Sequence, residues 1–362
     1  MRTNVSGIKK TGITARVIRI DPVRPEEDKI REAARVIKEG GLCAFPTETV
    51  YGLGVNAYNS NVVDRLYRIK KRPTSDPIIV HISDKTMLEA VVKTIPDIAL
   101  KLAEKFWPGP LTLIMERSDN VPENVSAGLP TVAVRMPSHK IALALIREAG
   151  VPVAAPSANI FSRPSSTQAQ HIVHDFSGEV DIVIDGGDST IGIESTVIDL
   201  TVEPAVLLRP GGTPMEPLQK VMPYLKLGPK YIQLNQGASS SPGMLTKHYS
   251  PRAELILYQG ESEKVREEIR EHVNRLQSQG RKVGLLLPTE DMEVLSDFEV
   301  EKADLGAEDD LESIGRNLFA CMRELDRKDL DVIIGRSFKS EGLGLAIVDR
   351  MIRASEGKVI RV

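Results

Sequence analysis

Two stretches of alternating apolar and amphipathic segments most constrain the fold of this 362-residue chain. Short apolar runs that alternate with helix-periodic segments are typical of α/β proteins, whose helices cover a sheet. In the first stretch, the predicted strands are 42–45, 78–82, 112–115, 132–135, 153–155, 181–184, 196–200 and 206–208. The predicted helices of that stretch are 26–39, 61–70, 97–106, 138–149 and 167–176. The sequence therefore predicts an α/β fold.

A segment rich in Gly, Ser, Pro and Asn separates the two stretches and has no hydrophobic periodicity. Such composition is typical of an interdomain linker. The second stretch alternates again, from the strand RAELILY to the final strand KVIRV, and the pattern GLGLA at 342–346 is interpreted as a helix start. We therefore expect a first α/β domain over 1–224, an interdomain linker over 225–252 and a small Rossmann-like α/β domain over 253–362.

Composition excludes several classes of protein. No segment approaches the run of about 18 apolar residues that a membrane span needs, and the N-terminal MRTNVSGIKKTG lacks the apolar core of a secretory signal. We therefore expect a cytoplasmic protein. Cys43 and Cys321 lie in apolar segments without metal-ligand spacing, so we expect buried thiols. The net charge of −3 argues against a protein that coats nucleic acid.

A dense group of cations ends the helix predicted over 61–70. It consists of Arg65, Arg68, Lys70, Lys71 and Arg72. Such a group suits a polyphosphate, because lysine offers a mobile charge and arginine pairs two oxygens at once. A solvated basic face is the alternative, since charge runs commonly decorate surfaces.

Several predicted strands run out into small polar residues or glycines. The segment 151–159 ends in Ser157 and Asn159, 46–54 places hydroxyls beside glycines, and 186–196 and 207–212 repeat the pattern. Ligands of open α/β sheets gather at such strand ends. Simple turns with Ser or Asn caps are the alternative.

Arg135 closes an apolar, alternating run that begins at Thr131. A cation that points inward from such a strand needs an anionic partner. A substrate carboxylate would serve, and so would an internal Asp or Glu.

Common catalytic motifs are absent from the sequence, which contains no GxxxxGK[ST], GxSxG or HExxH and no GxGxxG after the first strand. His171 and His174 lie at helical spacing, but no third ligand is suggested nearby. We interpret both as surface or half-buried residues and not as metal ligands.

Six motifs then occur in order between residues 44 and 212. They are PTETVYGLG, KKRP with the following DPIIVH, TVAVRMPSH, APSAN, GIESTVIDL and LLRPGG. Their order resembles the YrdC-like family, and the linker and second domain resemble its two-domain threonylcarbamoyl-AMP synthases. The family signature, Lys-x-Arg with Ser-x-Asn, corresponds to Lys70, Arg72, Ser157 and Asn159.

The resemblance implies a fold and a reaction. The fold is a twisted mixed sheet with surrounding helices and a concave, positively charged face. The reaction joins L-threonine, bicarbonate or carbon dioxide, and ATP into threonylcarbamoyl-AMP and pyrophosphate, towards threonylcarbamoyladenosine in tRNA. The implied partners are these substrates and the downstream tRNA threonylcarbamoyl transferase complex, with weak tRNA binding left open and no membrane.

The resemblance also implies roles for individual residues. Lys70 and Arg72 are the expected catalytic cations. The expected threonine pocket consists of Thr49, His81, Arg135 and Ser195, with Arg135 on the carboxylate. The expected ATP contacts are Arg72, Asp76, Thr131, Ser157, Asn159, Ser165, Arg209 and, from the linker motif HYSP, Tyr249.

Three positions depart from the family pattern, all near the implied nucleotide contacts. Asp76 stands where Asn is usual, Phe161-Ser162-Arg163 replaces Ser-Gly, and Ser166 replaces Pro. The sequence shows no carboxylate pair suited to magnesium, so we expect the ion to be carried mainly by the phosphates and to have no protein ligands.

Two other classes of function remain open. Hydrogenase-maturation carbamoyltransferases contain a YrdC-like module, but they also have Cys-rich zinc modules, which two isolated cysteines disfavour. An RNA-binding module could use the basic concavity to recognise shape. Steeply salt-dependent RNA binding without nucleotide turnover would distinguish that module.

Overall fold

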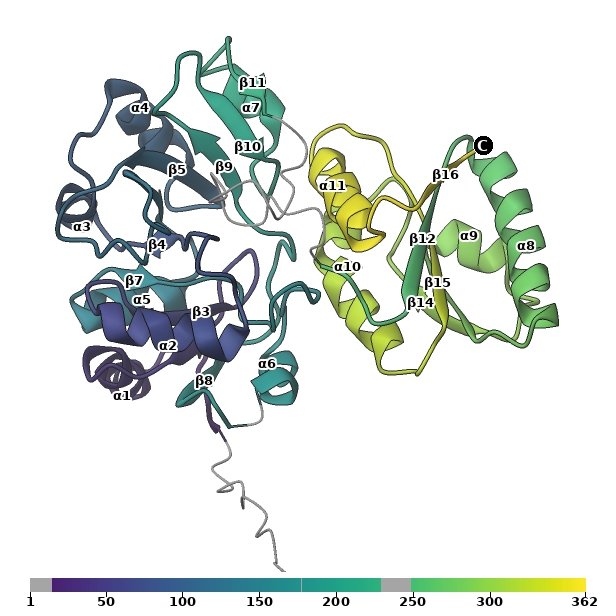
Figure 1. Ribbon diagram of the computed structural model, residues 1–362, viewed down its shortest axis with the longest axis horizontal. Coiled ribbons are helices and arrows are strands. Elements are labelled where there is room, and N and C mark those ends of the chain that lie inside the picture. Colours follow the sequence, from purple (N-terminus) through teal and green to yellow (C-terminus); the bar gives the residue numbers. More distant parts are fainter. Residues whose placement is uncertain (1–14, 177, 229–248) are drawn as a thin grey trace, which may run out of the picture.

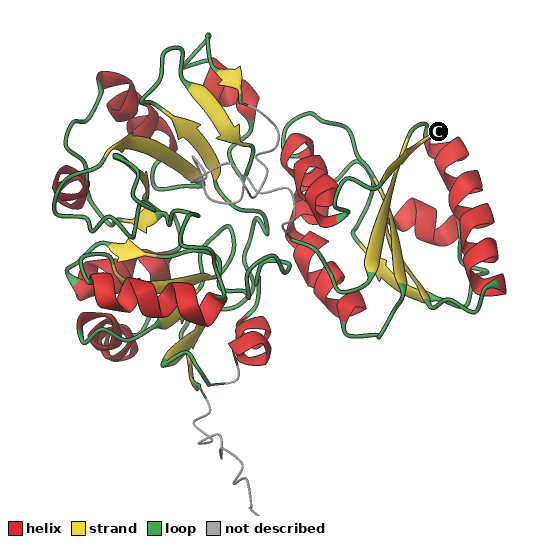
Figure 2. Ribbon diagram, viewed as in Figure 1, coloured by secondary structure: helices red, strands yellow, loops and turns green. Residues whose placement is uncertain are grey.

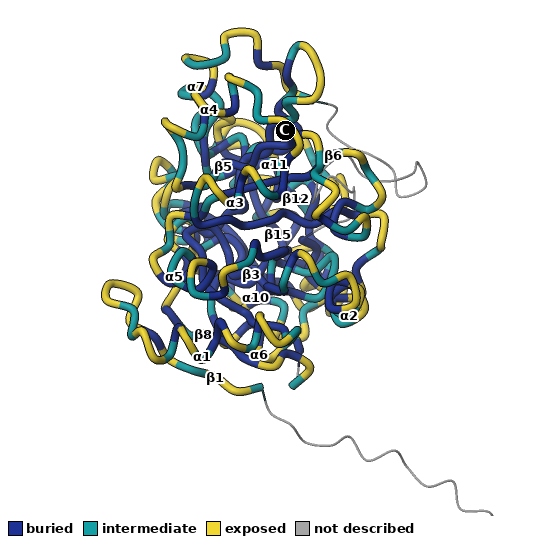
Figure 3. The backbone as a smooth tube through the Cα atoms, turned by 90° about the vertical axis from the view of Figure 1, so that its left-hand side faces the viewer, coloured by how far each residue is buried: buried dark blue, intermediate teal, exposed yellow. Residues whose placement is uncertain are grey.

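The computed structural model describes residues 15–176, 178–228 and 249–362, which form two bodies lying side by side (Figure 1). The N-terminal segment considered above and most of the predicted linker lie outside the described residues. Figure 2 shows helices around a sheet in each body. Figure 3 shows that buried residues gather along the strands, whereas exposed residues lie in loops and on outer helix faces.

One mixed sheet organises the larger body, with the strand order β1-β8-β2-β3-β7-β4-β6-β5-β9-β10-β11. Strand β4, for example, pairs parallel with β6 and antiparallel with β7. The strands are β1 (Arg16–Arg19), β2 (Cys43–Phe45), β3 (Gly52–Asn56), β4 (Val80–His81), β5 (Leu111–Glu116), β6 (Thr131–Arg135), β7 (Val153–Ala154), β8 (Ile182–Asp185), β9 (Thr196–Asp199), β10 (Val206–Arg209) and β11 (Lys226–Leu227).

All eight strands predicted in this body are present, and three further strands, β1, β3 and β11, were not predicted. Strand β3 was not predicted because it is rich in glycine, which weakens the hydrophobic pattern of a strand. A Cβ atom on Gly54 would lie 2.6 Å from Cε1 of Phe45 and 2.7 Å from Cγ1 of Val153. The close approach of neighbouring strands therefore requires glycine at a position that looks like a loop. Strand β11 pairs with β10 although it lies within the predicted linker.

The helices of the larger body cover this sheet. Those predicted from hydrophobic periodicity agree with the structure to within two residues at each end, and the short α3 and α7 are additional. The helices are α1 (Glu27–Lys38), α2 (Ser60–Lys70), α3 (Lys85–Val91), α4 (Asp97–Phe106), α5 (Lys140–Ala149), α6 (Ala169–Phe176) and α7 (Met215–Gln219).

Helix α2 delivers the basic segment to the sheet. It begins at a capping residue, Asn59, whose side chain accepts a hydrogen bond from the Val62 N–H at 3.2 Å. It ends at Lys71, which adopts a left-handed conformation with φ 54°. This change of direction turns the chain so that Lys70 and Arg72, on either side, are both buried in the protein.

The smaller body contains a parallel sheet with the order β14-β13-β15-β12-β16. Helices α10 and α11 lie on the side that faces the larger body, and α8 and α9 lie on the other side (Figure 1). The elements are β12 (Glu254–Gln259), α8 (Ser262–Ser278), β13 (Val283–Leu287), α9 (Thr289–Val294), β14 (Glu301–Asp304), α10 (Leu311–Asp326), β15 (Val332–Arg336), α11 (Gly344–Ala354) and β16 (Val359–Arg361). The parallel α/β character and the helix start at GLGLA are confirmed, whereas α9 and the charged β14 were not predicted.

Two expectations about single residues need correction. His171 is not at the surface, because it lies on the inner face of α6, is 2% exposed and accepts a hydrogen bond from the Thr167 N–H at Nδ1. Only His174 is exposed. Cys321 is only half-buried, whereas Cys43 is buried as expected, and both thiols are free. Among the described residues, no helix has the length and apolar character needed to cross a membrane.

The buried His171 predicts a pH-dependent stability. Burial, followed by the charges of Arg323 and Arg327, lowers the pKa of His171 to about 3, against about 6.5 in an unfolded chain. Because only the unfolded chain takes up the proton between these values, this residue lowers the free energy of unfolding by about 1.4 kcal/mol per pH unit as pH falls below about 6.5. Urea unfolding between about pH 7 and about pH 5 should therefore show a smaller pH slope for His171→Asn than for the wild type. Equal slopes would contradict this expectation.

Candidate active site

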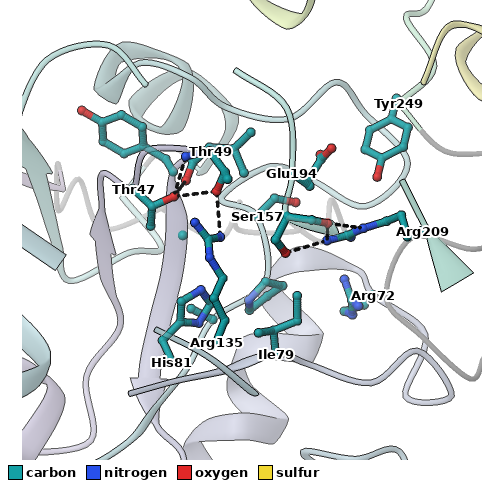
Figure 4. A pocket seen from close by; sticks show the side chains of 16 residues that line it. Thr47, Thr49, Arg72, Ile79, His81, Arg135, Ser157, Glu194, Arg209 and Tyr249 are labelled. Atoms are coloured by element: carbon teal, nitrogen blue, oxygen red, sulfur yellow. Dashed lines mark hydrogen bonds between the residues drawn. The ribbon is translucent and has the colours of Figure 1, made fainter. Parts of the chain in front are cut away.

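A pocket opens in the larger body where several strands end (Figure 4). Its empty volume is about 530 Å³, including space open to solvent. The segments after β2 and β7 supply part of its wall, and the ends of β4, β6 and β10 supply charged or polar side chains. The lining residues are Thr47, Thr49, Val50, Tyr51, Gly52, Arg72, Ile79, His81, Arg135, Ala155, Pro156, Ser157, Glu194, Ser195, Arg209 and Tyr249.

Arg135 faces this pocket but already has an internal carboxylate beside it. Its Nη2 lies 2.6 Å from Oε1 of Glu48, and both side chains are almost completely buried. Its Nη1 donates to Oγ1 of Thr49 at 2.8 Å, and its Nε donates to the Gly109 carbonyl at 3.2 Å. Burial opposes ionisation of Glu48, but the charge of Arg135 outweighs it and holds the pKa of Glu48 below its usual value. The internal carboxylate considered for Arg135 is therefore Glu48. A ligand carboxylate that entered the pocket would share the guanidinium with it.

His81 lies beside Arg135 and is a neutral imidazole. Burial, followed by the charge of Arg135, lowers the pKa of His81 to about 3. The ring of Phe45 meets the imidazole edge-on with a centroid distance of 6.3 Å. A neutral imidazole next to a buried guanidinium adds hydrogen-bonding capacity without further charge, which suits a zwitterionic or carboxylate ligand.

Arg72 is fixed at another side of the pocket by the turn that follows α2. Its Nη2 lies 2.9 Å from Oδ2 of Asp76, its Nε donates to the Asp76 carbonyl at 3.0 Å, and Nη2 donates to the Pro77 carbonyl at 2.7 Å. Asp76 itself does not line the pocket. The aspartate at this unusual position therefore serves, in the structure, as the partner that holds Arg72.

Lys70 lies behind the pocket wall. It is 1% exposed, and its Nζ donates to the carbonyls of Ser157 and Asn159, each at 2.5 Å. Burial, followed by the charge of Arg72, lowers the pKa of Lys70 well below its ordinary value. The hydroxyl of Ser157 in turn donates to Oδ1 of Asn159 at 2.5 Å. Of these three residues only Ser157 reaches the lining, and the other two hold its loop in place.

Arg209, labelled in Figure 4, forms a third polar corner of the pocket together with Ser195. The Arg209 guanidinium donates to the Ser195 carbonyl from Nε at 3.1 Å and from Nη2 at 2.8 Å, and Nη2 also donates to the Ser195 hydroxyl at 3.1 Å. Thr112 fixes that hydroxyl from the other side, with 2.7 Å between the two oxygens. Tyr249 completes this corner, and burial raises the pKa of its phenol to about 12.

The structure brings most, but not all, of the sequence-predicted site residues together. Eight line the pocket, namely Thr49, Arg72, His81, Arg135, Ser157, Ser195, Arg209 and Tyr249. Four lie behind this lining or against it, namely Lys70, Asp76, Asn159 and Ser165. Thr131 begins strand β6 whereas Arg135 ends it, so their Cα atoms are about 13 Å apart in an extended strand.

The basic segment of α2 is divided between different environments. Arg65 pairs with Asp181 at 2.9 Å on the surface, and Lys71 faces a second cleft between the bodies. Only Arg72 reaches the pocket. Part of this segment is therefore a solvated basic surface, as the alternative predicted, and Arg72 faces the pocket, as a ligand-binding role requires.

Sequence reasoning missed two buried carboxylates, Glu194 in the pocket lining and Glu48 beside Arg135. Both lie within motifs that were recognised, but nothing in their spacing showed that they would be buried. Glu48 pairs with Arg135, Asp76 with Arg72, and Glu194 with Arg350 at 2.8 Å. Among the residues that the structure describes, no group of three or more His, Cys, Asp or Glu side chains could hold a metal ion.

The fold and the pocket define an α/β protein with three arginines, Arg72, Arg135 and Arg209, in the lining of one pocket. Family models match residues of both bodies. A family described as "Telomere recombination" matches residues 35–211, and "Threonylcarbamoyl-AMP synthase, C-terminal domain" matches residues 214–356.

Similar proteins narrow the class to one family. The threonylcarbamoyl-AMP synthase of Pyrococcus abyssi is 46% identical over 94% of this chain and 97% of its own length. That of Bacillus subtilis is 42% identical over 94% of this chain and 97% of its own length. The crystal structure of P. abyssi Sua5 complexed with L-threonine covers 96% of this chain and 99% of its own, with a TM-score of 0.90 and 45% identity. The chain therefore belongs to the threonylcarbamoyl-AMP synthase family of ATP-dependent transferases, and the resemblance seen in the sequence is confirmed.

Proposed function

We propose that this enzyme converts L-threonine, bicarbonate or carbon dioxide, and ATP into threonylcarbamoyl-AMP and pyrophosphate in the pocket of Figure 4. The observation that carries the proposal is the convergence of Arg72, Arg135 and Arg209 on one pocket that His81 also lines. The amine of threonine forms a carbamate either with carbon dioxide, with loss of a proton, or with bicarbonate, with loss of water. A carbamate oxygen then bonds to the α-phosphorus, and the bond from that phosphorus to the bridging oxygen breaks, so that pyrophosphate leaves.

The threonine half of the pocket is assigned to Thr49, His81, Arg135 and Ser195. The carboxylate would pair with Arg135, whose charge is only partly engaged by Glu48 because a guanidinium has five N–H donors. The related P. abyssi protein was crystallised with L-threonine, which supports an amino-acid site in this family. A fixed cation and fixed hydroxyls would orient the carbamate before reaction, and such positioning lowers the barrier.

The nucleotide half is assigned to Arg72, Ser157, Arg209 and Tyr249. Two anions meet during the transfer, so neutralisation by preorganised cations would provide most of the catalysis. Asp76, Asn159 and Ser165 would act by holding residues of this wall. Thr131 begins β6, at the opposite end from Arg135, and does not line the pocket. Its contact with ATP therefore remains a prediction.

Lys70 is assigned to charge stabilisation during the transfer, acting together with Arg72. In the structure its ammonium serves two backbone carbonyls, so it would act through the Ser157 loop or by exchanging a carbonyl for a phosphate oxygen. Magnesium would be bound mainly by the phosphates, since Glu48, Asp76 and Glu194 each already pair with an arginine. It would add positive charge to the leaving pyrophosphate.

The remaining assignments follow from the product. The adenylate would be passed to the tRNA threonylcarbamoyl transferase complex in the cytoplasm. We also infer that 1–224 forms the catalytic domain, that 225–252 is the linker and that 253–362 forms the small second domain.

Release of pyrophosphate tests this function. With ATP and magnesium present, we expect pyrophosphate only when threonine and bicarbonate are both added, because the carbamate is the attacking group. Parallel reactions omit one component each, and a further reaction replaces threonine by serine. Pyrophosphate release that is unchanged without threonine would contradict the proposed reaction.

A further inference from the structure

The smaller body places a completely buried arginine directly behind the pocket. Arg350 on α11 is 0% exposed, and its Nε donates to Oε2 of Glu194 at 2.8 Å. Asp349 lies 2.8 Å from its Nη1. Glu194 lines the pocket in the larger body. The ion pair therefore connects the second body to the pocket wall without itself lining the pocket.

Glu194 also contacts residues next to the polar corner formed by Ser195 and Arg209. Its Oε1 accepts the hydroxyl of Ser165 at 2.5 Å, and its carbonyl accepts the Gly212 N–H at 2.9 Å. The next residue, Ser195, provides the oxygens that hold Arg209. A shift of Glu194 would therefore move both Ser195 and the arginine assigned to the nucleotide.

The same arginine also contacts the tyrosine of the wall. The guanidinium carbon of Arg350 lies 5.4 Å from the ring centroid of Tyr249, which is within the range of a cation–π contact. The ring of Phe319 on α10 lies on Tyr249 with a centroid distance of 5.2 Å. Two residues of the smaller body thus hold Tyr249 at the pocket.

The junction between the bodies is closely packed beside these contacts. Gly192 has φ 75°, and a Cβ atom there would lie 2.5 Å from the Cα atom of Arg316 on α10. Ile193 and Tyr249 share an apolar cluster with Leu318 and Phe319 of the same helix. A junction this close can hold Glu194 in one position, as a site that depends on positioning requires.

We propose that Arg350 is a positioning residue for adenylate formation, which fixes Glu194 and Tyr249 so that the pocket accepts ATP in its reacting geometry. The inference rests on the proposed function, and it gives the second body a role in the reaction. A buried ion pair contributes little to stability compared with apolar packing, whereas the contacts of Arg350 with Glu194 and Tyr249, which line the pocket, support a positioning role.

The test compares Arg350→Gln with a matched variant, Arg336→Gln. Arg336 is also buried in the smaller body and pairs with Asp291 at 3.1 Å and with Glu308 at 2.5 Å, but neither of these partners lines the pocket. We expect Arg350→Gln to raise the KM for ATP by about tenfold or more, because misplaced binding groups weaken binding and orientation. Arg336→Gln should stay within about twofold of wild type while losing comparable stability.

Calorimetric titration with ATP, together with thermal unfolding of each variant, separates positioning from folding. If Arg350→Gln does not fold, Arg350→Lys provides the same comparison against Arg336→Lys, since lysine keeps the charge but not the guanidinium geometry. Equal ATP affinity and equal kinetics in the Arg350 and Arg336 variants would overturn the inference. Wild-type protein that releases pyrophosphate without threonine would instead contradict the proposed function.

Discussion

Arg135→Ala is expected to lower kcat/KM for threonine by about a hundredfold to a thousandfold, with a much smaller change in the KM for ATP. The variant removes the buried cation to which the threonine carboxylate is assigned. It also leaves Glu48 buried beside that position without its partner, so the remaining charge would repel a carboxylate. Steady-state kinetics with each substrate varied in turn measure the two effects.

Two further variants serve as controls, one for the loss of a positive charge and one for the unpaired carboxylate of Glu48. Arg147→Ala removes an exposed cation from α5 and should leave the kinetics unchanged. Arg135→Ala combined with Glu48→Gln removes both charges, and it should recover part of the stability but not the use of threonine. An Arg135→Ala enzyme whose defect lies mainly in the use of ATP would contradict the assignment of Arg135.

Lys70→Ala is expected to slow turnover by about a hundredfold or more while the KM for threonine changes little. The lysine ammonium holds the carbonyls of Ser157 and Asn159, and its removal frees the loop that carries Ser157 into the pocket. It also removes a buried amine that interacts electrostatically with Arg72.

The neighbouring Lys71 provides a matched control, because it is exposed and faces the separate cleft between the bodies. Lys71→Ala should therefore retain turnover close to that of the wild type. Single-turnover measurements with saturating threonine and ATP separate the chemical step from binding. A variant at Lys70 that binds threonine poorly but turns over at a normal rate would reverse the proposed roles of Lys70 and Arg135.

Hydrophobic periodicity predicted the helices well, because amphipathic helices such as α4 place apolar residues at a regular spacing on one face. It also predicted the strands that are continuously apolar. The glycine-rich β3 and the charged β14 were missed, since local pattern carries little signal where neighbouring strands decide the outcome. The burial of His171 on α6 was also missed, because it depends on how the helix packs and not on the local sequence.

The composition of the site was predicted better than its contacts. Polar strand ends and ordered motifs indicated the residues that line the pocket, including Arg135 and Arg209. The sequence could not show that Glu48 would pair with Arg135 or that Lys70 would lie behind the wall, because these contacts depend on packing between distant segments. The contact of Arg350 with Glu194 joins residues 156 positions apart and has no local signature.

A crystal structure with L-threonine and a non-hydrolysable ATP analogue tests the central claim most directly. The account predicts both ligands in the single pocket of Figure 4, with the threonine carboxylate at Arg135 and the phosphates between Arg72 and Arg209. Nucleotide bound instead in the separate cleft lined by Lys71, Arg252 and Arg327, with threonine alone in the pocket, would contradict it.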